Sequence, residues 1–127
     1  MSQLSQDELL EVIRKAKSSH IRWRSYAQAL VDGVDLGDGR APVSHLECRF
    51  GRWYYGDGTE QLGQLDAFRN IEKPHEQLHT LYAQIDALVT EGKLPEAREQ
   101  LEELVGISRS LLDGIELLER EVKRLHD

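Results

Sequence analysis

The feature that most constrains this chain is an apolar repeat near its C-terminal end, where apolar or small residues recur at alternating spacings of four and three. That period is typical of one face of an α-helix. The repeat comprises Ala97, Leu101, Leu104, Ser108, Leu111, Ile115, Leu118, Val122 and Leu125. Because a helix cannot bury such a long apolar stripe on its own, the stripe has to pack against other long helices. The repeat therefore favours a fold built from helices.

A second repeat of the same period predicts a helix over residues 6–31. Its positions are Leu9, Ile13, Ala16, His20, Trp23, Ala27 and Leu30. Ser5 and Glu8 form a capping-box pattern ahead of this repeat, and Gly33 stands where a helix can end. One histidine thus falls within an otherwise apolar helix face.

The middle of the chain predicts a third long helix over residues 73–90, with Gly92 after its last turn and Pro95 in the first turn of the final helix. Shorter helices are predicted over residues 43–55, ending near the glycines of YYGDG, and over residues 60–72. The Gly- and Asp-rich stretch VDGVDLGDGRAP predicts a loop. Only RFGRWYY is ambiguous between helix and strand. We expect an all-α, antiparallel four-helix bundle with an additional short helix around the cysteine motif.

Length and charge limit the classes of function that this chain can have. A chain of 127 residues fits one domain, which we expect to span residues 1–127. The formal net charge of −7 argues against binding nucleic-acid phosphates or an anionic membrane. No apolar run approaches the ~20 residues of a membrane span, and the first residues lack the apolar core of a signal peptide. We therefore expect a soluble, cytoplasmic protein without membrane insertion.

The hexapeptide PHEQLH contains H-E-x-x-H, a pattern of zinc proteases in which two histidines bind metal and a glutamate activates water. A protease also needs a third ligand, an open coordination position and usually a sheet edge that holds the substrate. Tyr82 occupies the position of the glycine in the extended motif, and no strand is predicted nearby. The pairs Glu72/His75 and Glu76/His79 also match the E-x-x-H of di-iron bundles, but a second such pair on another helix is missing. We expect Glu76 to be a solvated helix residue.

His75 and His79 lie one helical turn apart and could chelate one metal ion. His20 should point into the bundle, and Cys48, the single cysteine, heads the aromatic-rich segment ECRFGRWYYGDG and should also face inward. A lone buried histidine could instead be satisfied by hydrogen bonds, and a lone buried cysteine could be a small hydrophobic residue. Burying several imidazoles without a partner is costly, however, and a zinc ion removes that cost.

Three motifs occur in a recognisable order. H-I-R-W begins at His20, C-R-F-G-R-W-Y begins at Cys48, and H-E-Q-L-H runs from His75 to His79. Over about residues 10–90 the sequence thereby resembles the bacterial chemoreceptor zinc-binding domain, usually called CZB. The resemblance implies a helical bundle, commonly a homodimer, in which one Zn²⁺ is held by three histidines and one cysteine. By that resemblance the ligands are His20, Cys48, His75 and His79.

The resemblance also implies a role in signalling. Members of the family sit in cytoplasmic chemoreceptors and diguanylate cyclases, where they sense zinc or, through the cysteine, oxidants such as hypochlorous acid. No methyl-accepting coiled coil and no cyclase domain is present in the sequence. We therefore expect a sensory module that acts through a partner, either free-standing or as part of a longer protein. A closed shell of four protein ligands leaves no position for an activated water, so we expect no enzyme activity.

Two further expectations concern the remaining residues. His45 is a possible ligand, but four-coordination is complete without it, and His126 should be solvated. The nine positions of the C-terminal repeat exceed what one short bundle would need. We expect part of that repeat, or the flanking Leu112 and Leu117, to pack against a second copy of the chain. A helical scaffold in which zinc is purely structural is the alternative, and the sequence does not rank zinc against an oxidant as the signal.

Overall fold

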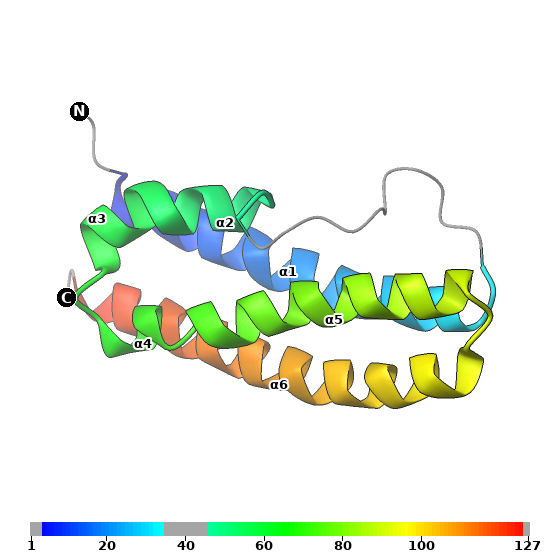
Figure 1. The fold of residues 1–127 in the computed structure, drawn as a ribbon. Helices are drawn as coiled ribbons and strands as arrows, with labels where there is room; N and C mark the ends of the chain where they lie inside the picture. Colours follow the sequence, from blue (N-terminus) through cyan, green and yellow to red (C-terminus); the bar gives the residue numbers. More distant parts are fainter. Residues whose placement is uncertain (1–3, 35–45, 126–127) are drawn as a thin grey trace.

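The computed structural model describes residues 4–34 and 46–125 (Figure 1). Within these residues every regular element is helical and no strand occurs. The elements follow in chain order as α1 (Gln6–Val31), α2 (Arg49–Trp53), the π-helical turn η2 (Tyr54–Gly58), α3 (Thr59–Leu62), α4 (Asp66–Arg69), α5 (Glu72–Thr90) and α6 (Leu94–Arg124). Figure 1 shows α1, α5 and α6 side by side, with the α2–α3 segment along the first half of α1. The prediction of an all-α bundle is confirmed.

Local sequence signals set the bounds of α1. The Ser5 side chain accepts a hydrogen bond from the Glu8 N–H at 3.1 Å, and the Glu8 carboxylate accepts one from the Ser5 N–H at 2.9 Å. These two bonds form the predicted capping box. Gly33 follows the helix with a φ of 82°, a left-handed conformation that favours glycine. The predicted helix over residues 6–31 is confirmed at both ends.

The helical hairpin of α5 and α6 also agrees with the sequence. Gly92 has a φ of 78° after the last turn of α5, and Pro95 lies in the first turn of α6. A proline there costs little because the first helical N–H groups have no partner within the helix. The short turn makes the two helices antiparallel, so α5 and α6 pack along their length.

The region around the cysteine motif departs from the prediction. The helix predicted over residues 43–55 begins at Arg49 in the described part of the chain, and residues 43–45 lie outside the description. The helix is interrupted at the predicted glycines, because Gly56 has a non-helical φ of −114° and ψ of −107° and forms a kink, after which the chain continues into α3. A Cβ atom at Gly58 would lie 3.0 Å from the Trp53 carbonyl oxygen and 3.1 Å from the Phe68 ring. Gly58 thus permits close packing just beyond the kink.

The single helix predicted over residues 60–72 is wrong. The structure has a turn at Gly63 and an extended residue at Leu65, with φ −81° and ψ 130°, between α3 and α4. This break lets Phe68 on α4 turn back onto Tyr54, with ring centroids 4.0 Å apart and the planes nearly parallel. Stacking of two large side chains therefore outweighs the helical periodicity of the segment.

The long repeat of α6 lies in the core. Its first eight positions, Ala97 to Val122, are buried, whereas Leu125 at the helix end is 51% exposed. Both α1 and α5 pack against α6, so helices of the same chain already cover the repeat. A second copy is therefore not needed to cover these eight positions, and the expected contact of part of the repeat, or of Leu112 and Leu117, with a second copy stays a prediction. The flanking Leu112 is half-buried and Leu117 is 41% exposed, which leaves them available for other contacts.

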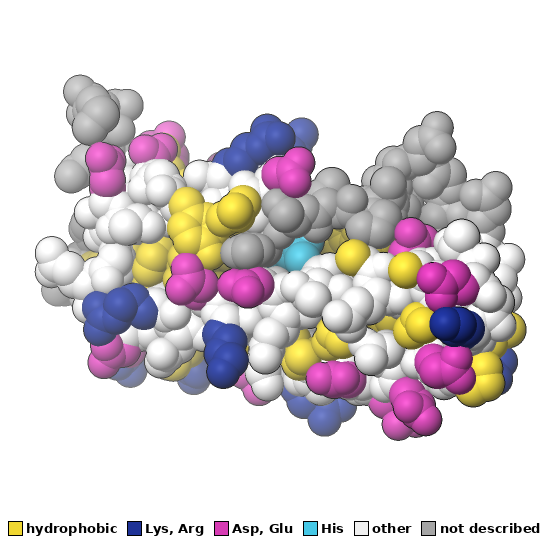
Figure 2. Space-filling model, in the orientation of Figure 1, with side chains coloured by type: hydrophobic (Ala, Val, Ile, Leu, Met, Phe, Trp, Pro, Cys, Tyr) yellow, Lys and Arg dark blue, Asp and Glu magenta, His cyan; other side chains and the backbone are white. Residues whose placement is uncertain are grey.

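Charged side chains of both signs cover the face in Figure 2. Some join helices, as in the ion pair between Arg14 on α1 and Glu119 on α6, whose Nε and Oε2 atoms are 2.9 Å apart. The hydrogen bond from Arg14, partly opposed by burial, lowers the pKa of Glu119. Among the described helices, none combines the length and the apolar character needed to cross a membrane.

Candidate metal centre

His20 lies on the inward face of α1 and is 2% exposed. Its Nδ1 atom is 2.8 Å from the carbonyl oxygen of Ala16, one turn earlier in the helix. Because a carbonyl can only accept, Nδ1 carries the proton, and the lone pair of Nε2 is left for a ligand. Burial lowers the pKa of His20 to about 4, so the ring is neutral at pH 7. A neutral imidazole is the form that binds metal.

Cys48 stands at the start of α2 as its N-cap residue. The Gly51 N–H donates to its Sγ atom at 3.2 Å. Burial raises the pKa of the thiol, and the Gly51 amide opposes that rise. Cys48 is only partly buried, unlike the three histidines of the centre. Without a metal the thiol therefore holds its proton at neutral pH, and a bound cation would have to displace it.

His75 and His79 lie one turn apart on α5 and are 1% and 6% exposed. The His75 Nε2 atom is 3.3 Å from the Cys48 Sγ atom. The centroids of the His75 and His79 rings are 4.8 Å apart, and those of His20 and His75 are 5.0 Å apart. Side chains from α1, from the start of α2 and from α5 thus meet at one point.

The geometry of this group suits a tetrahedral metal. One ligand atom from each of the residues His20, Cys48, His75 and His79 can be chosen so that all of them lie within 4.8 Å of one another. Zn–N bonds of about 2.0–2.1 Å and a Zn–S bond of about 2.3 Å imply ligand–ligand distances of roughly 3.3–3.6 Å. The Cys48–His75 distance already has that length. The structure brings the four predicted residues together, and their donor set fits zinc; their role as ligands stays a prediction.

Aromatic side chains enclose the group. The Phe50 ring contacts His20 and His75 edge to face, with centroid distances of 5.6 and 5.1 Å. The Trp23 ring is 6.1 Å from that of His79. The histidine visible in Figure 2 belongs to this group, because all described histidines do, so the group reaches the surface on that face. The centre is therefore shielded but lies close to solvent.

Sequence reasoning missed two backbone groups of this centre, the Ala16 carbonyl and the Gly51 N–H. The sequence contains a signal for each of these two groups. Ala16 stands four residues before His20 in the predicted helix, where its carbonyl faces the following turn. Cys48 and Gly51 have the spacing of an N-cap residue and the third helical residue, whose amide an N-cap side chain accepts.

One protein family, described as the chemoreceptor zinc-binding domain (CZB), matches residues 20–85. The chain belongs to this family. The matched region covers just over half of the chain and contains all four residues of the centre, whereas α6 lies beyond it. The resemblance noted in the sequence is confirmed. Comparisons with curated proteins and with solved structures gave no match.

Glu72 and Glu76, the two described carboxylates of the candidate motifs, do not join the centre of this CZB domain. Glu76 is exposed although its neighbours in the H-E-x-x-H pattern are buried. Glu72 is also exposed, and its carboxylate accepts a hydrogen bond from the Tyr55 hydroxyl at 2.8 Å. Neither carboxylate is therefore placed for protease or di-iron chemistry. His45 and His126 lie outside the described residues.

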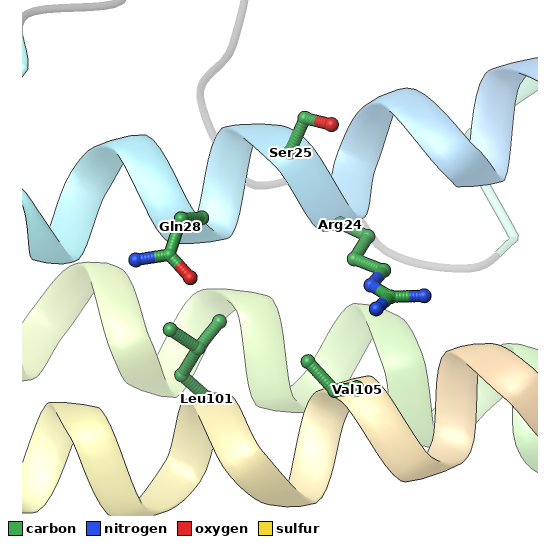
Figure 3. Close-up of a pocket in the computed structure, with 5 residues that line it drawn as sticks. All are labelled: Arg24, Ser25, Gln28, Leu101 and Val105. Atoms are coloured by element: carbon green, nitrogen blue, oxygen red, sulfur yellow. The ribbon is translucent and has the colours of Figure 1, made fainter.

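A shallow cavity of about 300 Å³ lies between α1 and α6 of the CZB domain (Figure 3). Its lining comprises Arg24, Ser25, Gln28, Leu101 and Val105. None of these residues belongs to the metal centre. The cavity therefore adds no group to the centre.

The exposed position of Glu76 leads to a direct prediction. The variant Glu76→Gln should bind zinc within about twofold of the parent, because Glu76 is exposed and does not belong to the group of ligand atoms. Competition with a chromogenic chelator would measure the affinity, and a peptide-hydrolysis assay would be run on both proteins. A peptidase activity that is present in the parent and absent from the Gln variant would restore the protease hypothesis.

Proposed function

We propose that this CZB domain is a zinc-binding sensory module in which His20, Cys48, His75 and His79 hold one Zn²⁺. The observation that carries the proposal is the meeting of these four ligand atoms within 4.8 Å, inside the region that matches the family. Three imidazole nitrogens and one thiolate suit zinc, which accepts both donor types in a tetrahedral shell.

The residues of the chain supply orientation and charge. The Ala16 carbonyl holds the His20 ring so that Nε2 faces the centre, and the Gly51 N–H would donate to the Cys48 thiolate. Zinc, when bound, supplies a cross-link between α1, the cysteine motif and α5. Four protein ligands complete the shell, and we propose no catalytic reaction for it.

Cys48 is the residue through which an oxidant would act. Cys48 is only partly buried, whereas the three histidines are buried. In the net reaction the thiolate and hypochlorous acid give sulfenic acid and chloride. A sulfur–oxygen bond forms, the oxygen–chlorine bond breaks, and the thiolate is oxidised by two electrons. Sulfenic acid is a poorer ligand than thiolate, so the bond between Cys48 and the metal would be lost. Release of zinc without oxidation would break the same bond, and reloading would restore it.

A partner protein would convert the state of this domain into a cellular signal. We propose that residues 1–127 form one cytoplasmic sensory domain whose state is read by a chemoreceptor, a diguanylate cyclase or another signalling protein. The proposal rests on the family and on the mixed charge of the described surface, which suits a protein partner better than nucleic acid or membrane.

The first test is the metal content. The chain, purified without added metal, should contain one zinc per chain by mass spectrometry of the elements. Hypochlorous acid added in small excess should release that zinc to a chromogenic chelator. Zinc that neither oxidant nor a physiological chelator removes would favour the structural alternative, and a chain without zinc would contradict the proposal.

We also propose a homodimer, now through apolar residues beside the α6 repeat. Leu117 is 41% exposed, and the half-buried Leu112 lies on the other flank of the repeat. The variant Leu117→Glu should weaken self-association at least tenfold, about 1.4 kcal/mol, because it places a charge in an apolar contact. Leu125→Glu, at an equally exposed position at the helix end, is the matched control. A parent that is monomeric by light scattering at high micromolar concentration would contradict the dimer.

A further inference from the structure

A pair of hydrogen bonds ties the segment that begins after Cys48 to Leu4, two residues before α1. The Leu4 N–H donates to Gln61 Oε1 at 3.0 Å, and Gln61 Nε2 donates to the Leu4 carbonyl oxygen at 2.9 Å. One amide side chain thus holds both polar groups of one backbone residue, which we call the Gln61 clamp. The clamp is partly buried and joins residues that are 57 positions apart in the sequence. Figure 1 shows α3 beside the start of α1.

The clamp and the metal centre lie at opposite ends of the segment Arg49–Leu62, which consists of two helical stretches joined by a kink at Gly56. Cys48 caps the first residue of α2, and α2, η2 and α3 follow without a gap as far as Leu62. At about 1.5 Å per residue, the part before Gly56 is roughly 12 Å long and the part after it roughly 8 Å, and Figure 1 shows α2 and α3 at opposite ends of the segment. Gln61 therefore cannot touch the ligand atoms, and any effect of one end on the other has to pass through the segment.

The middle of the segment is fixed to the bundle. The Tyr54 ring stacks on Phe68 of α4, and its hydroxyl donates to the Phe68 carbonyl oxygen at 2.6 Å. Gly58 packs closely on the same ring, since a Cβ atom there would lie 3.1 Å from Phe68 Cε2. The Thr59 hydroxyl closes the π-helical turn by donating to the Tyr54 carbonyl oxygen at 2.6 Å. The segment is thus held at its centre on Phe68 and at each end by a separate contact.

We propose that the segment Arg49–Leu62 acts as a lever on Phe68, through which loss of the metal at Cys48 loosens the Gln61 clamp and releases the start of α1. This inference rests on the proposed function, because it takes Cys48 as a metal ligand. A coupling of this kind is reciprocal: if the metal strengthens the clamp, the clamp strengthens metal binding by the same factor. Measured couplings between sites are typically about 5-fold to 150-fold.

The test compares Gln61→Ala with Gln64→Ala. Gln64 lies three residues further on and is exposed, so its substitution is a matched control. Zinc affinity, measured by chelator competition, should fall about fivefold or more in Gln61→Ala and stay within about twofold in Gln64→Ala. Amide exchange by NMR should show that zinc removal speeds exchange of the Leu4 N–H in the parent. In Gln61→Ala this amide should exchange fast with or without zinc.

Two results would contradict the lever proposal. One is an unchanged zinc affinity in Gln61→Ala, and the other is a Leu4 amide in the parent that exchanges at the same rate with and without zinc. Circular dichroism of each variant checks that the helices are intact. If the parent takes up no zinc, the proposed function fails and the lever is judged by Cys48→Ala. This substitution removes the α2 cap whatever the metal does. It should speed Leu4 exchange, and an unchanged rate would contradict the lever.

Discussion

The variant His75→Ala is expected to bind zinc more than about 100-fold more weakly than the parent. Loss of a partner that only orients a metal ligand typically costs about 10–100-fold in affinity, so loss of a ligand should cost more. His75 Nε2 lies 3.3 Å from Cys48 Sγ. Removing it takes away one nitrogen of the shell and also the neighbour that positions the thiol.

Three further variants make this result specific. Cys48→Ala should lose zinc to a similar degree, because it removes the only thiolate. Cys48→Ser should also bind weakly but should no longer respond to hypochlorous acid. His45→Ala should leave the affinity unchanged, since the shell is expected to be complete without that residue. Isothermal titration in the presence of a competing chelator measures all four, and an unchanged affinity in His75→Ala would rule out the centre described above.

Removal of zinc is expected to leave the long helices folded while lowering the melting temperature by roughly 10 °C. A ligand at 100 times its Kd stabilises the native state by about 2.7 kcal/mol, and 1 kcal/mol shifts the melting temperature of a domain of this size by a few degrees. The helices should persist because α1, α5 and α6 share a core that does not involve the metal. This core includes Ile13, Ile85, Leu104, Ile115 and Leu118, none of which is exposed.

The loosening should be local. Cys48 is the point at which the α2–α3 segment joins the metal centre, so amide exchange should rise mainly from residue 46 to residue 62. The amide of Leu4 should respond with that segment. Circular dichroism at 25 °C and exchange mapped by mass spectrometry, each with and without chelator, measure the two effects. A collapse of the whole helical signal on chelation would instead make zinc a folding cofactor, as in zinc fingers.

Local chemistry made the long helices predictable. The reciprocal bonds of Ser5 and Glu8, and the left-handed glycines Gly33 and Gly92, depend only on neighbouring residues. Such signals act in the same way in any fold, because they satisfy the free backbone groups of a helix end. The predicted bounds of α1 agree with the structure for this reason.

The predictions failed where a long-range contact decided the outcome. Residues 60–72 looked like one helix, but the chain breaks at Gly63 and Leu65 so that Phe68 stacks on Tyr54. The α6 repeat looked too long for one chain, but α1 and α5 cover it on both sides. In each case the local pattern was correctly recognised, while its structural partner lay elsewhere in the chain and was not visible in the pattern.

The metal centre, too, was predictable from the sequence only in part. The sequence by itself determined the ligand types, the placing of His20 on an apolar helix face, and the spacing of His75 and His79 by one turn of α5. Only the tertiary structure decided that Cys48 meets them, since its position depends on how the α2–α3 segment packs against the bundle. Periodicity fixes which face of a helix is buried but not which residues of another helix lie opposite, because that register is set by side-chain packing between elements.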